Sequence, residues 1–294
     1  MKKGRLVIGT FVLSASIALG GLGIRFMQQD GDGEEIAVEI GTPDLVSGME
    51  VWKGETGREE AEAPNVKEHT ALMKNLTKRE AKEQEIYSFL QGPKSWKKKV
   101  DWSGKWTKMS INGNTFGGFG CGLCCIANVY STLSPYEASP IDAFQFAKKN
   151  SEYAPSGVSG AISWEDMKKT LNKMGVESSL GFKPKTYKTF RKNLKRAKAA
   201  IVLVCSYNDD ALWDNTLGHY VSLWLYQDKD GTAFLADPGS PDRNRSTIST
   251  KLAYRALKTA SPYQVLYIWG YNSEKDQWKH GGKVREKWVR PDYI

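Results

Sequence analysis

The spacing of apolar residues predicts helices in the first two thirds of this chain and strands in the last third. Helical spacing or helix-start signals occur in five stretches, at residues 66–91, 121–133, 140–149, 163–175 and 186–197. Runs rich in β-branched and aromatic residues predict four strands, at 199–207, 219–226, 232–237 and 261–271. The turn sequence QDKDG joins the second and third strands, which we expect to form a hairpin. Helices followed by an antiparallel sheet predict the α+β class.

The N-terminus has the pattern of an export signal or a membrane anchor. Lys2, Lys3 and Arg5 precede nineteen residues, 6–24, without a charged side chain, and Arg25 follows. A positive start and an apolar run are typical of secretory signals, and nineteen residues also nearly cross the hydrocarbon core as a helix. Both alternatives place the rest of the chain outside the cytoplasm. We therefore expect an exported protein, either extracellular or anchored to the outer face of the cytoplasmic membrane.

Composition divides the chain into five parts. Residues 1–25 are the expected signal peptide or anchor, and residues 26–64 are an acidic, glycine-rich spacer. Residues 65–93 are expected to be a helical linker segment, because helix formers continue up to the breaking pair Gly-Pro. Residues 94–272 are the expected main domain, and residues 273–294 are a C-terminal tail.

The charge of the chain is unevenly distributed. The net charge is +9, but residues 25–64 carry eleven acidic and three basic side chains, so the rest of the chain is strongly basic. A net positive charge on the folded part of the chain keeps it soluble and also attracts it to anionic surfaces. We expect association with the membrane or an anionic cell envelope and no nucleic-acid partner; the oligomeric state stays open.

Three of the four cysteines lie together, in FGGFGCGLCC at residues 116–125. A structural zinc site needs four ligands, and no second cysteine pair is present, so we expect no metal and no cofactor. A disulfide from Cys205 to Cys124 or Cys125 is compatible with export. The other interpretation of Cys124 and Cys125 is that they are small apolar residues on a buried helix face.

Cys121 has the surroundings of a nucleophile. Glycines stand on both sides of it, where a helix is predicted to begin, and glycine permits a tight turn and close approach of a substrate. A helix N-terminus stabilises a thiolate, which is the reactive form of cysteine. Such a thiol needs a histidine as its base.

The chain has only three histidines, His69, His219 and His280. His69 lies in a charged helical segment and His280 lies beyond the last predicted strand, where surface roles are expected. His219 opens a predicted strand at an edge of the sheet that faces the loops, so it is the expected base for Cys121.

Asp237 is the expected third member of the site, because the predicted hairpin returns it to the level of His219. A carboxylate at this position orients the imidazole and fixes its tautomer. The alternative is an ordinary Asp-Pro turn at the end of a strand, and Asp209, Asp210 and Asp214 are weaker rivals in the preceding loop.

These segments resemble a known family. GCGLCCIANVYSTL is similar to the nucleophile helix of the bacterial peptidase C39-like group of papain-like cysteine peptidases, and GHYVSLWLYQDKDGTAFLADPG resembles its histidine–hairpin–aspartate segment. SGAISWEDMKKTLNKMGVE is similar to the region between them. The resemblance covers about residues 96–271. It implies a papain-like α+β catalytic domain with a triad of Cys121, His219 and Asp237.

The resemblance implies an exported cysteine hydrolase, a peptidase that cleaves peptide bonds of a peptide or protein substrate. Members of the family often carry a glutamine before the cysteine to complete the oxyanion hole, and none lies between Lys94 and Cys121. Asn112 and Asn114 are the expected substitutes. Two alternatives remain at this stage: a peptidoglycan hydrolase of the NlpC or CHAP type, and a papain-like binding module without catalytic activity.

Overall fold

The computed structural model describes residues 78–111, 113–155, 160–206, 212–213, 216–279 and 283–284. All of them belong to the unit that spans Glu55–Ile294. Residues 1–77 lie outside the described residues. They include the expected signal or anchor, the acidic spacer and the first part of the expected linker segment. None of the helices in the described part of the chain combines the length and apolar character needed to span a bilayer.

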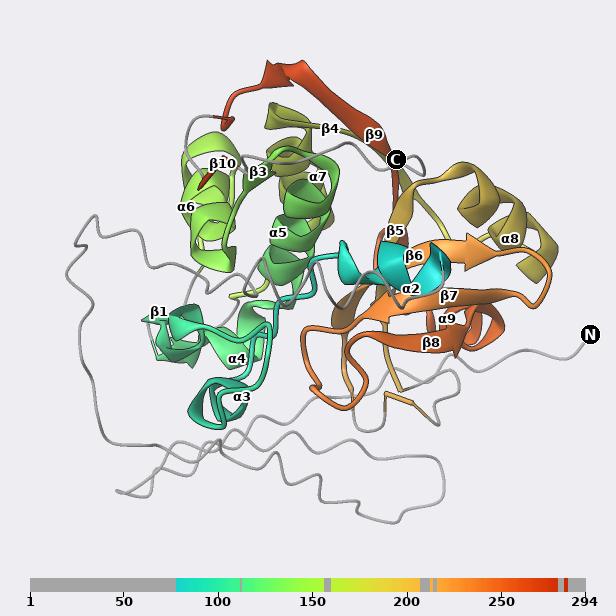
Figure 1. The fold of residues 1–294 in the computed structure, drawn as a ribbon, viewed down its shortest axis with the longest axis horizontal. Coiled ribbons are helices and arrows are strands. Elements are labelled where there is room, and N and C mark those ends of the chain that lie inside the picture. Colours follow the sequence, from blue (N-terminus) through green and yellow to red (C-terminus); the bar gives the residue numbers. More distant parts are fainter. Residues whose placement is uncertain are drawn as a thin grey trace, which may run out of the picture. The chain divides into compact units, whose positions relative to one another are not determined.

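The fold is mixed α+β, built around one antiparallel sheet of six strands (Figure 1). The strands lie in the order β4-β9-β5-β6-β7-β8, and every neighbouring pair is antiparallel. Their bounds are β4 Met174–Gly181, β5 Ala199–Val204, β6 His219–Gln227, β7 Thr232–Ala236, β8 Ser246–Ser249 and β9 Val265–Asp276. The predicted hairpin over QDKDG is confirmed as the β6–β7 pair.

Helices cover both faces of this sheet, which explains why the central strands are apolar throughout. On β5, Ile201 and Leu203 pack with helix α5 (Cys121–Leu133), whereas Val202 and Val204 pack with α8 (Tyr187–Arg196) and α9 (Thr250–Ala256). Successive side chains of a strand point to opposite faces. A strand with both faces covered therefore reads as a continuous apolar run.

The remaining helices begin where the sequence predicts. Helix α6 (Pro140–Asn150) starts at Ser139, whose hydroxyl accepts the backbone N–H of Asp142 in a capping box. Helix α7 (Trp164–Lys173) is capped by Ser163 in the same way. The other elements are short: α2 Lys78–Gln84, α3 Pro93–Lys97, η1 Lys105–Lys108, β1 Ser110–Ile111, β2 Asn114–Thr115, α4 Phe116–Phe119, β3 Tyr136–Glu137 and β10 Lys283–Val284.

The helix expected over 66–91 is wrong for residues 85–91. The described part of that stretch is helical only in α2, and the chain then runs without helical structure to Gly92. The backbone N–H groups of Tyr87 and Phe89 donate to Thr132 Oγ1 (3.0 Å) and Asn128 Oδ1 (2.8 Å), both on α5. Side chains of α5 thus satisfy backbone groups that a helix would satisfy internally. Residues 86–91 are buried or half-buried in the same folded unit as α5.

The C-terminal boundary also differs from the expectation. Strand β9 continues through residue 276, and Asp276 accepts hydrogen bonds from the hydroxyls of Tyr130 (2.6 Å) and Tyr271 (2.7 Å). The start of the expected tail is therefore part of the core. The sequence pattern does not predict strands β4 and β8 or helix α9, because these segments are polar or short. They are stabilised by pairing and packing with other elements.

Candidate active site

Cys121 is the first residue of α5, as the glycine pattern predicts. The glycines before it form the one-turn helix α4, and Gly120 links the two helices in a right-handed helical conformation. A Cβ atom on Gly120 would collide with the ring of Phe116, so the close approach of the two helices requires glycine here. The thiol of Cys121 is buried, with only 7% of the residue exposed.

His219 lies between Cys121 and Asp237. Its Nε2 is 2.7 Å from Oδ1 of Asp237, and because a carboxylate only accepts, the imidazole is the donor. It also lies close enough to Cys121 for hydrogen bonding and charge to shift the pKa of both groups. With Nε2 engaged by the carboxylate, Nδ1 is the nitrogen left for sulfur. The three residues named from the sequence therefore form one connected chain of contacts.

The electrostatics of the pair favour a thiolate beside an imidazolium. Burial alone raises the pKa of the Cys121 thiol, but the hydrogen bond and charge of His219 outweigh it. The backbone N–H groups of Tyr220 and Gly122 also donate to the sulfur, and the net pKa of Cys121 lies below its ordinary value. Burial lowers the pKa of His219, yet the hydrogen bonds and charges of Asp237 and Cys121 raise it to about 10. Because the cysteine has the lower pKa, the proton resides on the imidazole.

Asp237 is completely buried and held by five hydrogen bonds. It follows β7 and lies next to Gly239, where an added Cβ would come within 2.9 Å of the His219 ring. Its oxygens accept from Trp213 Nε1 (3.2 Å), the Gly239 N–H (2.8 Å), Arg243 Nε (2.8 Å) and His219, and its own N–H donates to Asn244 Oδ1 (3.0 Å). Burial raises the pKa of this carboxyl, but His219 and Arg243 hold it well below its usual range. The carboxylate is thus fixed in charge and position.

Gln91 is a candidate site residue that the sequence reasoning missed. Its Nε2 donates to the carbonyl of Gly117 (2.6 Å), four residues before Cys121, and its backbone N–H donates to the carbonyl of Pro238 (2.9 Å), next to Asp237. The side chain is buried, and its Oε1 has no protein partner among the described residues. The sequence pattern assigns residues 65–93 to a helical linker segment and therefore predicts no site residue there. The sequence signal that could have identified Gln91 is the largely apolar run IYSFL immediately before it, most of which is buried in the structure.

The structure describes only one of the two asparagines expected to replace that glutamine. Asn112 lies outside the described residues. Asn114 lies in β2, where it pairs with Ile111, and the groups that lower the pKa of Cys121 do not include it. Gln91, hydrogen-bonded to Gly117 and Pro238 close to Cys121 and Asp237, is a further oxyanion candidate beside the two asparagines.

The remaining cysteines are free thiols in the core. Cys124, Cys125 and Cys205 are buried and unpaired, so the disulfide considered for Cys205 is not present. Burial raises the pKa of Cys124 and Cys125 well above the ordinary value, so both stay protonated. This arrangement agrees with small apolar residues on a buried helix face. Within the described ranges, no three His, Cys, Asp or Glu side chains gather in a way that suits a metal ion.

The other histidines and the rival carboxylates named from the sequence are not among the described residues. His69 and His280 lie outside the described residues, and so do Asp209, Asp210 and Asp214. His219 is thus the one histidine in the described part of the chain, and Asp237 is the carboxylate bound to it.

Comparison with known proteins adds no assignment. No family model matches this chain, and no curated protein matches it either. The argument for a function therefore starts from the geometry around Cys121.

Proposed function

We propose that this chain is a cysteine peptidase that cleaves peptide bonds with Cys121, His219 and Asp237. The observation that supports it most is the unbroken chain of contacts from the Cys121 thiol through His219 to a fully buried Asp237. A structural histidine does not need a thiol on one nitrogen and a buried carboxylate on the other. Nucleophilic catalysis by cysteine needs both.

In the proposed reaction, the Cys121 thiolate attacks the carbonyl carbon of the substrate and forms a sulfur–carbon bond. The imidazolium of His219 then gives its proton to the leaving amine, and a thioester remains on Cys121. His219 next takes a proton from water, which attacks the thioester and releases the acid and the free thiolate. Asp237 keeps the imidazole oriented through both halves of the reaction.

The oxyanion of each tetrahedral intermediate needs hydrogen-bond donors. We assign this role to the backbone N–H of Cys121, at the start of α5, and to the side-chain amide of Gln91. An amide nitrogen carries two hydrogens, and the Gly117 carbonyl uses one of them. Donors of this type typically contribute about 100- to 1000-fold to the rate.

The fold proposal is a papain-like arrangement. The nucleophile begins a buried helix that packs on an antiparallel sheet, and the base and its carboxylate come from neighbouring strands of that sheet. These features agree with the resemblance to the peptidase C39-like group.

Labelling and cleavage with matched variants test the proposal. The purified full chain is treated with a peptide that carries an electrophilic epoxide, and the modified residue is located by mass spectrometry. We expect modification of Cys121, loss of labelling in Cys121→Ala, and cleavage of a peptide library by the wild type only. An unlabelled Cys121 would contradict the peptidase, since a thiolate beside an imidazolium reacts with such reagents.

The same experiment separates the two alternatives. A labelled Cys121 with digestion of purified peptidoglycan, but not of the library, would replace the peptidase with a wall hydrolase. A labelled Cys121 that cleaves neither would support a binding module. Gln91 argues against the latter, because a module without activity has no need of an oxyanion donor.

We also propose that the domain functions outside the cytoplasm, on the basis of the N-terminal sequence pattern. A reporter that is active only in an oxidising compartment, fused after residue 64, should be active. A reporter that is intact but silent would contradict export.

A further inference from the structure

Helix α8 and the residues around it form a strongly basic surface. Residues 182–198 contain eight Lys or Arg side chains and no Asp or Glu. One side of α8 is buried through Phe190 and Leu194, so its basic side chains gather on the other side. Of these, Lys188, Lys192 and Lys198 have no carboxylate partner among the described residues. A solvated helix face explains the charge, but not the shape of this surface.

The basic surface is hollowed on both sides of Lys195. One hollow has a volume of about 400 Å³ and is lined by the basic residues Arg79, Lys82, Lys195 and Lys198, together with Tyr226 and Gln227. The other, of about 670 Å³, is lined by Lys188, Arg191, Lys192 and Lys195, with Asp228 as its one acidic residue. Both are lined by Lys195, and we call the two hollows together, between α2, α8 and the β6–β7 turn, the α8 groove.

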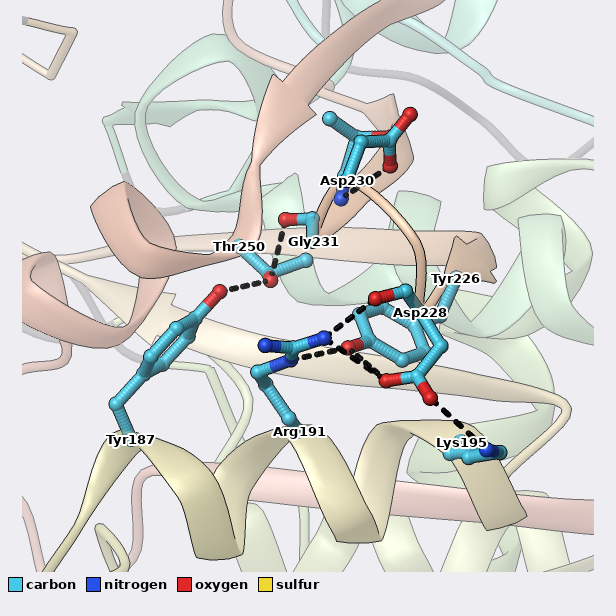
Figure 2. Close-up of polar contacts among 9 residues, drawn as sticks. Tyr187, Arg191, Lys195, Tyr226, Asp228, Asp230, Gly231 and Thr250 are labelled. Atoms are coloured by element: carbon cyan, nitrogen blue, oxygen red, sulfur yellow. Dashed lines mark hydrogen bonds and ion pairs between the residues drawn. The ribbon is translucent and has the colours of Figure 1, made fainter.

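The α8 groove already binds one carboxylate, that of Asp228 (Figure 2). Its Oδ2 accepts from Lys195 Nζ (2.9 Å), and its Oδ1 accepts from Arg191 Nη2 (2.9 Å) and the Tyr226 hydroxyl (3.0 Å). Arg191 Nε donates in turn to the Tyr226 oxygen (2.7 Å), which fixes the guanidinium. Lys195 and then Tyr226 and Arg191 lower the pKa of Asp228 to about 2. These contacts show how the groove holds a carboxylate, and they leave Lys188 and Lys192 available for a second one.

We propose that the α8 groove binds an acidic segment of a polypeptide in extended conformation. The bound carboxylate of Asp228 shows that the side chains of the groove accept the charged group that an acidic polypeptide carries. Basic side chains on one side of α8 recur every three or four residues, about 4.5–6 Å along its axis. An extended peptide with acidic residues at alternate positions presents carboxylates about 6.6–6.8 Å apart on one side. Ligand and groove thus match in charge.

The position of the groove relative to His219 indicates which polypeptide this is, an inference that rests on the proposed peptidase function. His219 and Gln227 are the two ends of the nine-residue strand β6. Eight steps of a strand span about 26 Å. A substrate that occupies both sites therefore needs its acidic segment about eight or more residues from the cleaved bond. The groove selects acidic substrates without contacting the reacting atoms.

Binding is measured separately from cleavage. A fluorescein-labelled peptide of five Glu-Gly repeats, made with D-glutamate so that it resists proteolysis, is titrated with the full chain, and its anisotropy gives the Kd. We expect binding that weakens as salt is raised and that is absent for the Gln-Gly peptide. The double variant Lys188→Gln/Lys192→Gln should weaken binding about five- to tenfold. Asp228→Asn should tighten it several-fold, since it releases Arg191 and Lys195.

Matched variants separate the groove from net charge. Lys148→Gln/Lys149→Gln removes two exposed charges from α6, and Glu152→Gln removes an exposed acid, as Asp228→Asn does. Both should change the Kd less than twofold. Equal effects in groove and control variants would overturn the site. Tighter binding of linear polyphosphate or of anionic vesicles, lost in the groove variant, would overturn the ligand class. Because no bond is cleaved, these outcomes are independent of whether Cys121 is catalytic.

Discussion

Replacing His219 by alanine should raise the pKa of Cys121 above that of a free thiol, and not only return it to that value. In the wild type, burial of Cys121 is the largest influence on its pKa and acts upward; His219 is the main reason that the net pKa is low. Without His219, burial is opposed only by the backbone N–H groups of Tyr220 and Gly122. A thiol in apolar surroundings is harder to ionise than one in water.

The size of the effect follows from the lost hydrogen bond. A hydrogen bond to a charged group contributes about 1.5–3 kcal/mol, and one pKa unit corresponds to about 1.36 kcal/mol. Loss of this bond alone therefore moves the pKa of Cys121 by about one to two pH units. Loss of the imidazolium charge adds to the change. At pH 6, where only thiolate reacts, the alkylation rate should fall by about 100-fold or more.

Iodoacetamide alkylation of Cys121 between pH 5 and 10 measures this pKa. Fragment ions in mass spectrometry distinguish Cys121 from Cys124 and Cys125, which lie in the same peptide. His219→Gln provides a second variant that keeps a polar side chain in the space. Replacement of His69 or His280 should leave the profile unchanged. Identical profiles for the wild type and both His219 variants would show that the two residues are not coupled, and the proposed catalytic pair would be refuted.

Three further predictions follow from the site and the core. Gln91→Ala should lower kcat by about 100- to 1000-fold, as loss of an oxyanion donor does, while the rate of Cys121 alkylation stays unchanged. Equal losses of kcat and of alkylation rate would show that Gln91 supports the structure of the site and does not bind the oxyanion. Arg243→Gln should raise the pKa of His219 by about one pH unit, because the negative charge of Asp237 is then no longer offset by the guanidinium 2.8 Å away. The alkaline limb of the pH–activity profile should move to higher pH, and an unchanged limb would contradict this coupling. Cys124→Ala and Cys125→Ala should each reduce the free energy of unfolding by roughly 1 kcal/mol while Cys121 stays reactive, and a reactivity loss in folded Cys124→Ala would contradict a packing role.

The sequence alone determined helices α5 to α8 and four of the six strands of the main sheet, and it identified the three residues of the candidate site. Helix α5 begins at Cys121 because glycines precede an apolar run, and α6 and α7 begin at serine caps. The β6–β7 hairpin is a local structure that returns Asp237 to the level of His219. A register shift between Trp224 and Gln227, and the hydrogen bonds of Trp213 and Arg243 to Asp237, complete the placement.

Tertiary structure decided what depends on contacts between distant segments. Residues 85–91 have helix-forming neighbours, but Thr132 and Asn128 of α5 bind the backbone of Tyr87 and Phe89, so this stretch is not helical. That conformation, together with the Pro238 carbonyl, places Gln91 at the site, 30 positions before Cys121 in the sequence. The polar strand β4 likewise exists because β9 supplies its hydrogen bonds. Local patterns record only the preferences of nearby residues, whereas these positions are fixed by partners that the chain brings together when it folds.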